Sequence, residues 1–348
     1  MQFFNNRKGW IALWLTIVTL TMQGGARADD DIERIFIFGD SLSDPGNVHQ
    51  LLINFGLDPT TEAPFSLDDI IPSAPYNYQG FQFSNGKTWA QRFARHLGTK
   101  RPGKAALVKP GKFTNYAFGG ATASFAGNLR SGPEQIMRYT ADFPGPADDQ
   151  ALYVIQFGGN DVRAALESPA DAEAIVSMAV TSEFNMILEL YQKGARNFLV
   201  ANAPDISLSP AIKLEDAVKT QPPYNLPAGF VIGFTNTLVV NYNLGLEMVL
   251  ANLEQLFPDI SINRLDFFGI LNDISTNPGR YGITNTVSSC INYFVTVDQI
   301  CDKPNKFLFW DGIHPTRKVH RIVSKIAAAL YDDGDGDEDQ DEYEDEDD

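Results

Sequence analysis

The feature that most limits how this chain can fold is an alternation of short apolar segments with longer helical ones. The short segments are rich in β-branched and aromatic residues, and they cover 35–38, 114–117, 152–157, 197–201 and 261–265. The helical patterns cover 87–97, 170–192, 230–256 and 317–330. Buried parallel strands are nearly continuously apolar, and strands that alternate with helices form doubly wound sheets. The sequence therefore predicts an α/β fold, a flavodoxin-like parallel sheet of about five strands with helices on both faces.

Two segments, 54–84 and 202–227, show neither pattern. Both are rich in proline and aromatic residues and are longer than ordinary connections. We expect them to be irregular and to shape a binding surface. The aromatic side chains of 54–84 suit an apolar acyl chain, and they equally suit a packed loop.

The first residues are typical of a targeting segment. Arg7 and Lys8 precede an apolar stretch, 10–22, and the Ala-Arg-Ala sequence at 26–28 has the form that signal peptidase cleaves. We expect residues 1–28 to be a signal peptide that directs the protein to the periplasm or to the cell exterior. A single uncleaved anchor is the alternative, although the stretch is short for a membrane span.

The formal net charge of −17 is concentrated at the end of the chain. Residues 332–348 hold thirteen acidic side chains and no basic one, so we expect a disordered, solvated tail. Loose binding of cations or basic partners is the alternative role. Residues 29–331 contain no linker-like stretch and read as one domain. A basic stripe is lacking, which argues against nucleic acid as a partner, and we expect a monomer.

Cys290 and Cys301 are the two cysteines of the sequence. An even number in an exported chain favours one local disulfide, and two buried free thiols are the alternative. The chain has four histidines and no paired motif with zinc-ligand spacing. We therefore expect neither a metal site nor another cofactor.

Ser41 lies where the first predicted strand stops at a Gly-Asp-Ser turn. Open parallel sheets bind ligands at the carboxyl edge of their strands, and this turn delivers a hydroxyl to that edge. Asp311 and His314 stand three positions apart in a turn with Gly and Pro near the other end of the chain. A serine hydroxyl needs a neutral imidazole to become a nucleophile, so the three residues suggest a nucleophile, a base and an orienting acid. Taken alone, Gly-Asp-Ser is equally well explained as a simple turn.

The other histidines, His49, His96 and His320, lack a neighbouring carboxylate of this kind and are expected to be structural or solvent-facing. His49 follows the serine turn closely enough to line a site there.

Two further glycine-rich turns, 115–122 and 156–161, follow predicted strands. Ester cleavage at a serine needs donors for a tetrahedral oxyanion, and glycine N–H groups and an Asn side chain are suitable. Each Gly-Gly pair alone is weak evidence, because tight turns also favour glycine.

Taken together, these blocks resemble the GDSL esterase/lipase family, within the SGNH hydrolases. The matching segments are 38–44, 115–122, 158–161 and 311–315, with further similarity at 83–89 and 198–204. The resemblance covers about 35–330, and the acidic tail has no counterpart in it. An α/β-hydrolase is not indicated, because that fold requires Gly-x-Ser-x-Gly and Ser43 stands at the position of the second glycine.

The resemblance implies Ser41 as nucleophile, His314 as general base and Asp311 as the residue that orients the imidazole. It also implies an oxyanion hole formed by the N–H groups of Ser41 and Gly120 and by the side chain of Asn160. The expected function is that of a secreted serine esterase or lipase that cleaves carboxylic esters through an acyl-serine intermediate. The expected partner is a small ester or lipid, with transient contact to lipid surfaces. Acyl transfer to a second alcohol is the alternative reaction, and a non-catalytic binding protein or adhesin is the alternative class.

Overall fold

A computed structural model describes residues 32–56, 81–99, 103–124, 130–291 and 300–331 of the chain. The predicted signal peptide and the acidic tail lie outside these residues, as does most of the segment 54–84. No helix in the described part of the chain combines the length and the hydropathy that crossing a bilayer requires.

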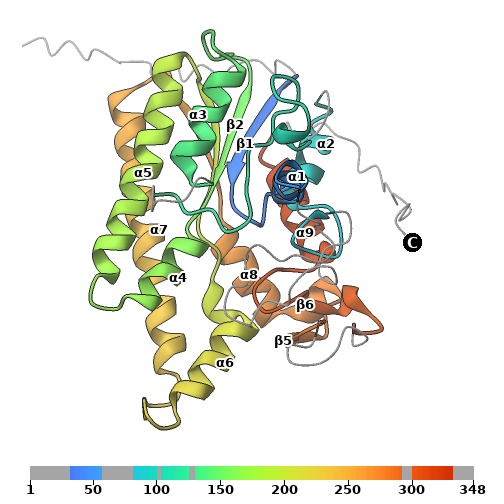
Figure 1. Cartoon of the computed structure of the whole chain (residues 1–348), viewed down its shortest axis with the longest axis vertical. Helices are drawn as coiled ribbons and strands as arrows, with labels where there is room; N and C mark the ends of the chain where they lie inside the picture. Colours follow the sequence, from blue (N-terminus) through green and yellow to red (C-terminus); the bar gives the residue numbers. More distant parts are fainter. Residues whose placement is uncertain (1–31, 57–80, 100–102, 125–129, 292–299, 332–348) are drawn as a thin grey trace, which may run out of the picture. The chain divides into compact units, whose positions relative to one another are not determined.

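The centre of the fold is a four-stranded parallel sheet (Figure 1). Its strands lie in the order β1 (Ile35–Gly39), β2 (Leu152–Gln156), β3 (Asn197–Ala201) and β4 (Ser261–Leu265). Each strand pairs in parallel with the next, so the carboxyl ends of all four strands meet at one edge.

The predicted strand 114–117 pairs with the outer side of β1 without becoming a regular strand. The N–H groups of Tyr116 and Phe118 donate to carbonyls of β1 at 2.7 and 3.0 Å. The side chain of Asn115 turns back to accept the N–H of Ala117 at 2.9 Å and to donate to the carbonyl of Ser43 at 2.9 Å. Because these bonds bend the segment towards the serine turn, it pairs at isolated bridges only.

Alternate residues of each strand face opposite sides of the sheet, and both sides are covered by helices. Phe36 and Phe38 pack on one side, and Ile35 and Ile37 pack on the other. The first side is covered by α3 (Gly132–Asp142), α4 (Gly159–Glu167), α5 (Ala172–Lys193) and α7 (Phe230–Leu256). The second is covered by α2 (Trp89–His96), α8 (Phe267–Thr276) and α9 (Arg317–Ala328). The predicted doubly wound α/β architecture is confirmed.

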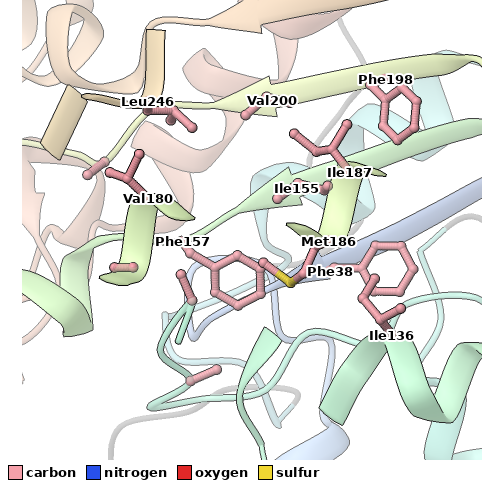
Figure 2. Packing of buried hydrophobic residues seen from close by; sticks show 14 of the residues in the cluster. Phe38, Ile136, Ile155, Phe157, Val180, Met186, Ile187, Phe198, Val200 and Leu246 are labelled. Atoms are coloured by element: carbon pink, nitrogen blue, oxygen red, sulfur yellow. The ribbon is translucent and has the colours of Figure 1, made fainter. Parts of the chain in front are cut away.

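Figure 2 shows part of the largest buried cluster among the described residues, between the sheet and α5. Phe38, Ile155 and Val200 come from three neighbouring strands and pack with Met186 and Ile187 of α5. All five side chains are buried. Truncating a buried phenylalanine to alanine lowers the free energy of unfolding by about 3–5 kcal/mol. This layer therefore contributes strongly to the stability of the sheet.

The four predicted helices are present as α2, α5, α7 and α9, with small shifts at their ends. The prediction that 202–227 is irregular is wrong in part, because this segment contains α6 (Pro210–Lys219). Ser209 caps α6 by accepting the N–H of Ile212 at 3.4 Å, and a proline occupies the first helical position. Four further helices, α1 (Asn47–Asn54), α3, α4 and α8, were not predicted from the sequence.

A small parallel pair, β5 (Asn285–Ser289) and β6 (Phe307–Phe309), lies outside the central sheet. Cys290 and Cys301 form a disulfide directly after β5. The chain leaves β6 through the turn 310–316 and enters α9, so this pair supports the turn that contains Asp311 and His314.

Candidate active site

The turn after β1 is held by side chains from distant parts of the sequence. The side-chain amide of Gln135 accepts the N–H of Gly39 at 2.9 Å and donates to its carbonyl at 2.8 Å. A side chain at Gly39 would place its Cβ 2.8 Å from the carbonyl oxygen of Gln156, so the strand requires glycine here. The next residue, Asp40, is buried and accepts the N–H of Leu42 at 2.9 Å. Burial raises the pKa of Asp40 to about 6, although its hydrogen bonds oppose that shift.

The structure brings Ser41, His314 and Asp311 into one hydrogen-bonded row. Nε2 of His314 lies 2.8 Å from Oγ of Ser41, and Nδ1 lies 2.7 Å from Oδ2 of Asp311. A carboxylate only accepts, so Nδ1 carries the imidazole proton and Nε2 is left to accept from the serine hydroxyl. The exposed fractions are 7% for Ser41, 3% for His314 and 0% for Asp311, so the row is shielded from bulk water.

The turn that holds Asp311 and His314 is closed by hydrogen bonds within itself. Oδ1 of Asp311 accepts the N–H groups of Ile313 and His314 at 2.9 and 2.8 Å. The carbonyl of His314 accepts the N–H of Trp310 at 2.7 Å, which closes the turn. One oxygen of Asp311 thus fixes the backbone while the other meets the imidazole.

A second turn, which contains Gly119 and Gly120, approaches Ser41 and is held by the side chains of Asp44 and Arg130. The N–H of Gly119 donates to Oδ2 of the buried Asp44 at 2.9 Å, so this amide is already used inside the protein. Nη1 of Arg130 donates to the carbonyl of Gly119 at 2.9 Å. The carbonyl of Gly119 and the N–H of Gly120 belong to one planar trans peptide and point in opposite directions. Arg130 therefore sets the direction of the Gly120 N–H.

Asn160 stands at the start of α4 and lines the same pocket as Ser41 and His314. Its Nδ2 donates to the carbonyl of Ala121 at 2.9 Å, which ties this turn to the turn of Gly119. An amide nitrogen carries two hydrogens, so a second donor remains for a bound ligand. The neighbouring Asp161 accepts the N–H of Ala123 at 2.9 Å and strengthens the same tie.

The buried polar side chains of Tyr242 and Glu183 support the turn that contains Gly158 and Asn160. Gly158 has a φ of +105°, and a Cβ there would come within 2.7 Å of the Tyr242 ring. The hydroxyl of Tyr242 donates to Glu183, whose side chain is fully buried. Burial raises the pKa of Glu183 to about 8, so this carboxyl is protonated at neutral pH.

The remaining histidines stand apart from this row. His320 is buried, and its Nδ1 accepts the N–H of Trp89 at 3.1 Å. Burial lowers the pKa of His320 to about 3, which keeps the ring neutral in a structural role. His49 packs against Phe81 with ring centroids 3.7 Å apart and the rings tilted by 31°, and it does not line the pocket of Ser41. His96 ends α2.

The pocket above Ser41 holds about 450 Å³ of space, part of it open to solvent. Most of its walls are apolar, and Arg163 is the one basic side chain besides His314 among its described lining residues. The apolar lining consists of Leu42, Pro204, Ile206, Leu271, Phe309, Ile313 and Pro315. An activated hydroxyl beneath an apolar cleft can accept an acyl group. Within the described part of the chain, no group of three or more His, Cys, Asp or Glu residues is arranged to hold a metal ion.

Fold and site together define a doubly wound α/β protein with a Ser–His–Asp row at the carboxyl edge of its parallel sheet. A sequence model of the GDSL-like lipase/acylhydrolase family matches residues 35–327, and the chain belongs to this family.

Named relatives agree with this assignment. Lipase 1 of Photorhabdus luminescens is 26% identical over 85% of this chain, which spans 50% of the length of that lipase. A GDSL esterase/lipase of Arabidopsis thaliana is 24% identical over 89% of this chain and 86% of its own length. GDSL esterase/lipase 6 of the same plant is 25% identical over 86% of this chain and 87% of its own length. Family and relatives support the hydrolysis of esters.

Proposed function

We propose that this protein is an exported serine hydrolase that cleaves carboxylic esters of lipids or other acyl groups through an acyl-serine intermediate. The single observation that carries the proposal is the row in which Nε2 of His314 lies 2.8 Å from Oγ of Ser41 while Nδ1 lies 2.7 Å from Asp311. Export rests on the leader at 1–28, and we assign the hydrolase domain to 29–331. Residues 332–348 would be a solvated acidic tail.

In the first half of the proposed reaction, Oγ of Ser41 attacks the ester carbonyl carbon while His314 takes its proton at Nε2. The carbonyl oxygen becomes an oxyanion. When the tetrahedral intermediate collapses, the bond to the alcohol breaks and the imidazolium returns the proton to that alcohol. Asp311 holds the ring in the required tautomer and stabilises its positive charge.

In the second half, water replaces the alcohol. His314 takes a proton from the water, the hydroxide attacks the acyl-serine, and the serine oxygen leaves with the proton. The products are the free acid and the original hydroxyl.

The proposed oxyanion hole uses the N–H groups of Ser41 and Gly120 and the side chain of Asn160. The Gly119 amide is not assigned to the oxyanion hole, because it is bonded to Asp44 at 2.9 Å. Donors that are fixed before the reaction stabilise the oxyanion without reorganising during it. Arg130 would act as a positioning residue, because its bond to the Gly119 carbonyl orients and polarises the peptide that ends in the Gly120 N–H.

The proposed acyl site is the apolar part of the pocket. Its walls lie beside Ser41 and suit an alkyl chain, while Asp40, Asn160, Arg163 and Asp205 line other parts of the pocket.

Hydrolysis of a short p-nitrophenyl ester tests the proposal. The purified protein should release p-nitrophenol, and Ser41→Ala should abolish nearly all of this turnover while leaving the circular dichroism spectrum unchanged. Half of the wild-type rate in Ser41→Ala would contradict the assignment. Analysis of the products of a phospholipid, with and without an added alcohol, separates free fatty acid from transferred acyl product.

A further inference from the structure

The hairpin of α6 and α7 begins at the wall of the pocket and extends beyond the carboxyl edge of the sheet (Figure 1). Pro204 and Ile206 line the pocket, and α6 starts at Pro210. The N–H of Ala211 donates to the carbonyl of Gly312 at 3.0 Å, which ties the base of α6 to the turn of Asp311 and His314. A helix of this length carries the chain about 15 Å away from its base.

The end of the hairpin is preformed. The buried Asp216 of α6 accepts the N–H groups of Gly229 and Val231 at 2.8 and 2.9 Å, and so caps the first turn of α7. The N–H of Leu226 donates to the carbonyl of Lys219 at 2.9 Å. A carboxylate at a helix N-terminus is favoured by the helix dipole as well as by these bonds. The connection therefore presents its side chains in a fixed arrangement.

Three apolar side chains at this end are exposed, and we call them the apolar tip. The exposed fractions are 53% for Val218, 54% for Tyr224 and 50% for Phe230. No residue between Lys219 and Glu247 is charged. Lys219, whose Nζ lies 5.2 Å from the centroid of the Tyr224 ring, is itself paired with Glu215 at 3.2 Å. The tip can thus leave water without burying an unpaired charge.

The size of the apolar tip argues against a protein partner. Its half-exposed side chains offer on the order of 300 Å², whereas a stable protein interface needs about 800 Å² from each partner. A lipid surface sets no such minimum, and aromatic rings with a polar atom at one end favour the boundary between headgroups and acyl chains. The net charge of −17 opposes approach to an anionic surface.

We propose that the apolar tip docks on a zwitterionic phospholipid surface and holds the pocket of Ser41 against it. The role in supplying substrate rests on the proposed function, since a lipid ester leaving the surface would enter the pocket at the base of the hairpin. The docking itself does not depend on turnover.

Vesicle binding of the full-length Ser41→Ala protein tests the docking without hydrolysing the vesicles. Sedimentation with phosphatidylcholine vesicles should show binding. The added pair Tyr224→Ser and Phe230→Ser should lower the partition coefficient at least tenfold, with an unchanged melting temperature. The control pair Met137→Ser and Met248→Ser, whose side chains are 57% and 74% exposed outside the tip, should stay within twofold.

Activity separates this inference from the proposed function. With Ser41 intact, the tip pair should hydrolyse a soluble short ester at the wild-type rate and lose at least tenfold on the same acyl ester held in vesicles. If no variant cleaves either ester while vesicle binding still requires the tip, the proposed function fails and the docking stands.

Four results would overturn the docking. They are absence of binding to phosphatidylcholine vesicles, equal binding by the tip pair, tighter binding to anionic vesicles, and a dimer in lipid-free solution that the tip pair dissociates. A single tip substitution, Phe230→Ser, gives the same readings with a smaller effect if the pair fails to fold.

Discussion

The turn that carries Ser41 and the turn that carries His314 are built in different ways. Ser41 follows a buried strand, and the backbone on either side of it is held by Gln135 and Asn115, which lie 96 and 72 positions from the residues they bind. His314 lies outside the central sheet, and its turn is closed by Asp311 within the same few residues. The backbone around the nucleophile is thus held by residues from distant parts of the chain, whereas the turn of the base is closed by a local motif.

The two turns should therefore respond to different substitutions. Changes that loosen the sheet edge should disturb the serine and the oxyanion donors together, because one network of side chains holds them. Changes in the turn of His314 should affect proton transfer while leaving the sheet intact.

The largest loss of activity is expected for Ser41 and His314, the two residues through which the two turns contact each other. Ser41→Ala and His314→Ala should each lower kcat on a soluble ester by about 10⁵–10⁶, and the double variant should be no slower than either single one. The reason is that each residue acts only through the other. Steady-state kinetics measure this, with His96→Ala as the histidine control. Multiplying losses in the double variant would mean that the two residues work independently.

On the sheet side, Asn160→Ala should lower kcat by about 10²–10³ with little change in KM, because its amide would bind the oxyanion and not the ground-state ester. The exposed Asn185→Ala is the matched control. An increase in KM alone would place Asn160 in substrate binding rather than in transition-state stabilisation.

A smaller loss of kcat is expected for Arg130, which contacts the peptide of the proposed oxyanion hole and not the reacting atoms. Arg130→Met should lower kcat about tenfold with KM unchanged, since loss of the bond to Gly119 leaves the Gly120 N–H present but less well oriented. Arg130→Lys, which keeps a donor, should recover part of the rate. Equal losses in both variants, together with a lower melting temperature, would indicate a structural role only.

Substitution of Glu183, which is buried near the turn of Asn160, should have the smallest effect on activity. It should instead change the free energy of unfolding. The pKa of Glu183 in the folded protein is about 8, against an ordinary value of 4.5. The folded state therefore keeps a proton that the unfolded chain releases between these values, and this contribution to the free energy of unfolding falls as pH rises through that window.

Glu183→Gln should accordingly gain about 4 kcal/mol relative to wild type between pH 5 and pH 9. Urea unfolding at several pH values measures the difference, and the exposed Glu189→Gln on the same helix is the control. Parallel stability curves for wild type and Glu183→Gln would show that Glu183 titrates as it does in the unfolded chain.

Local chemistry explains what the sequence could predict. The strand before Ser41, the closed turn of Asp311 and His314, and the long helices each depend on neighbouring residues, so their patterns are visible in the sequence. The short helix α6 was missed because its capping signal, Ser209 before a proline, lies in a segment dominated by proline and aromatic residues.

Long-range contacts explain what the sequence could not predict. The hydrogen bond between Gly119 and Asp44 joins residues 75 positions apart in the sequence, and the one between Tyr242 and Glu183 joins residues 59 positions apart. For neither pair does a sequence motif indicate which distant residue the partner is. A glutamate that is buried in a helix cannot be distinguished in the sequence from one that faces solvent. The segment 114–117 was expected to be a strand because its composition does not reveal how the Asn115 side chain bends the backbone.

Labelling by a fluorophosphonate tests the central claim most directly, because the reagent reacts only with a serine that a neighbouring base activates. Mass spectrometry of the labelled wild-type protein should place the adduct on Ser41, and His314→Ala should react at least 10³-fold more slowly while keeping its fold. An adduct on another residue, or an unchanged labelling rate in His314→Ala, would contradict the claim that these two groups act together.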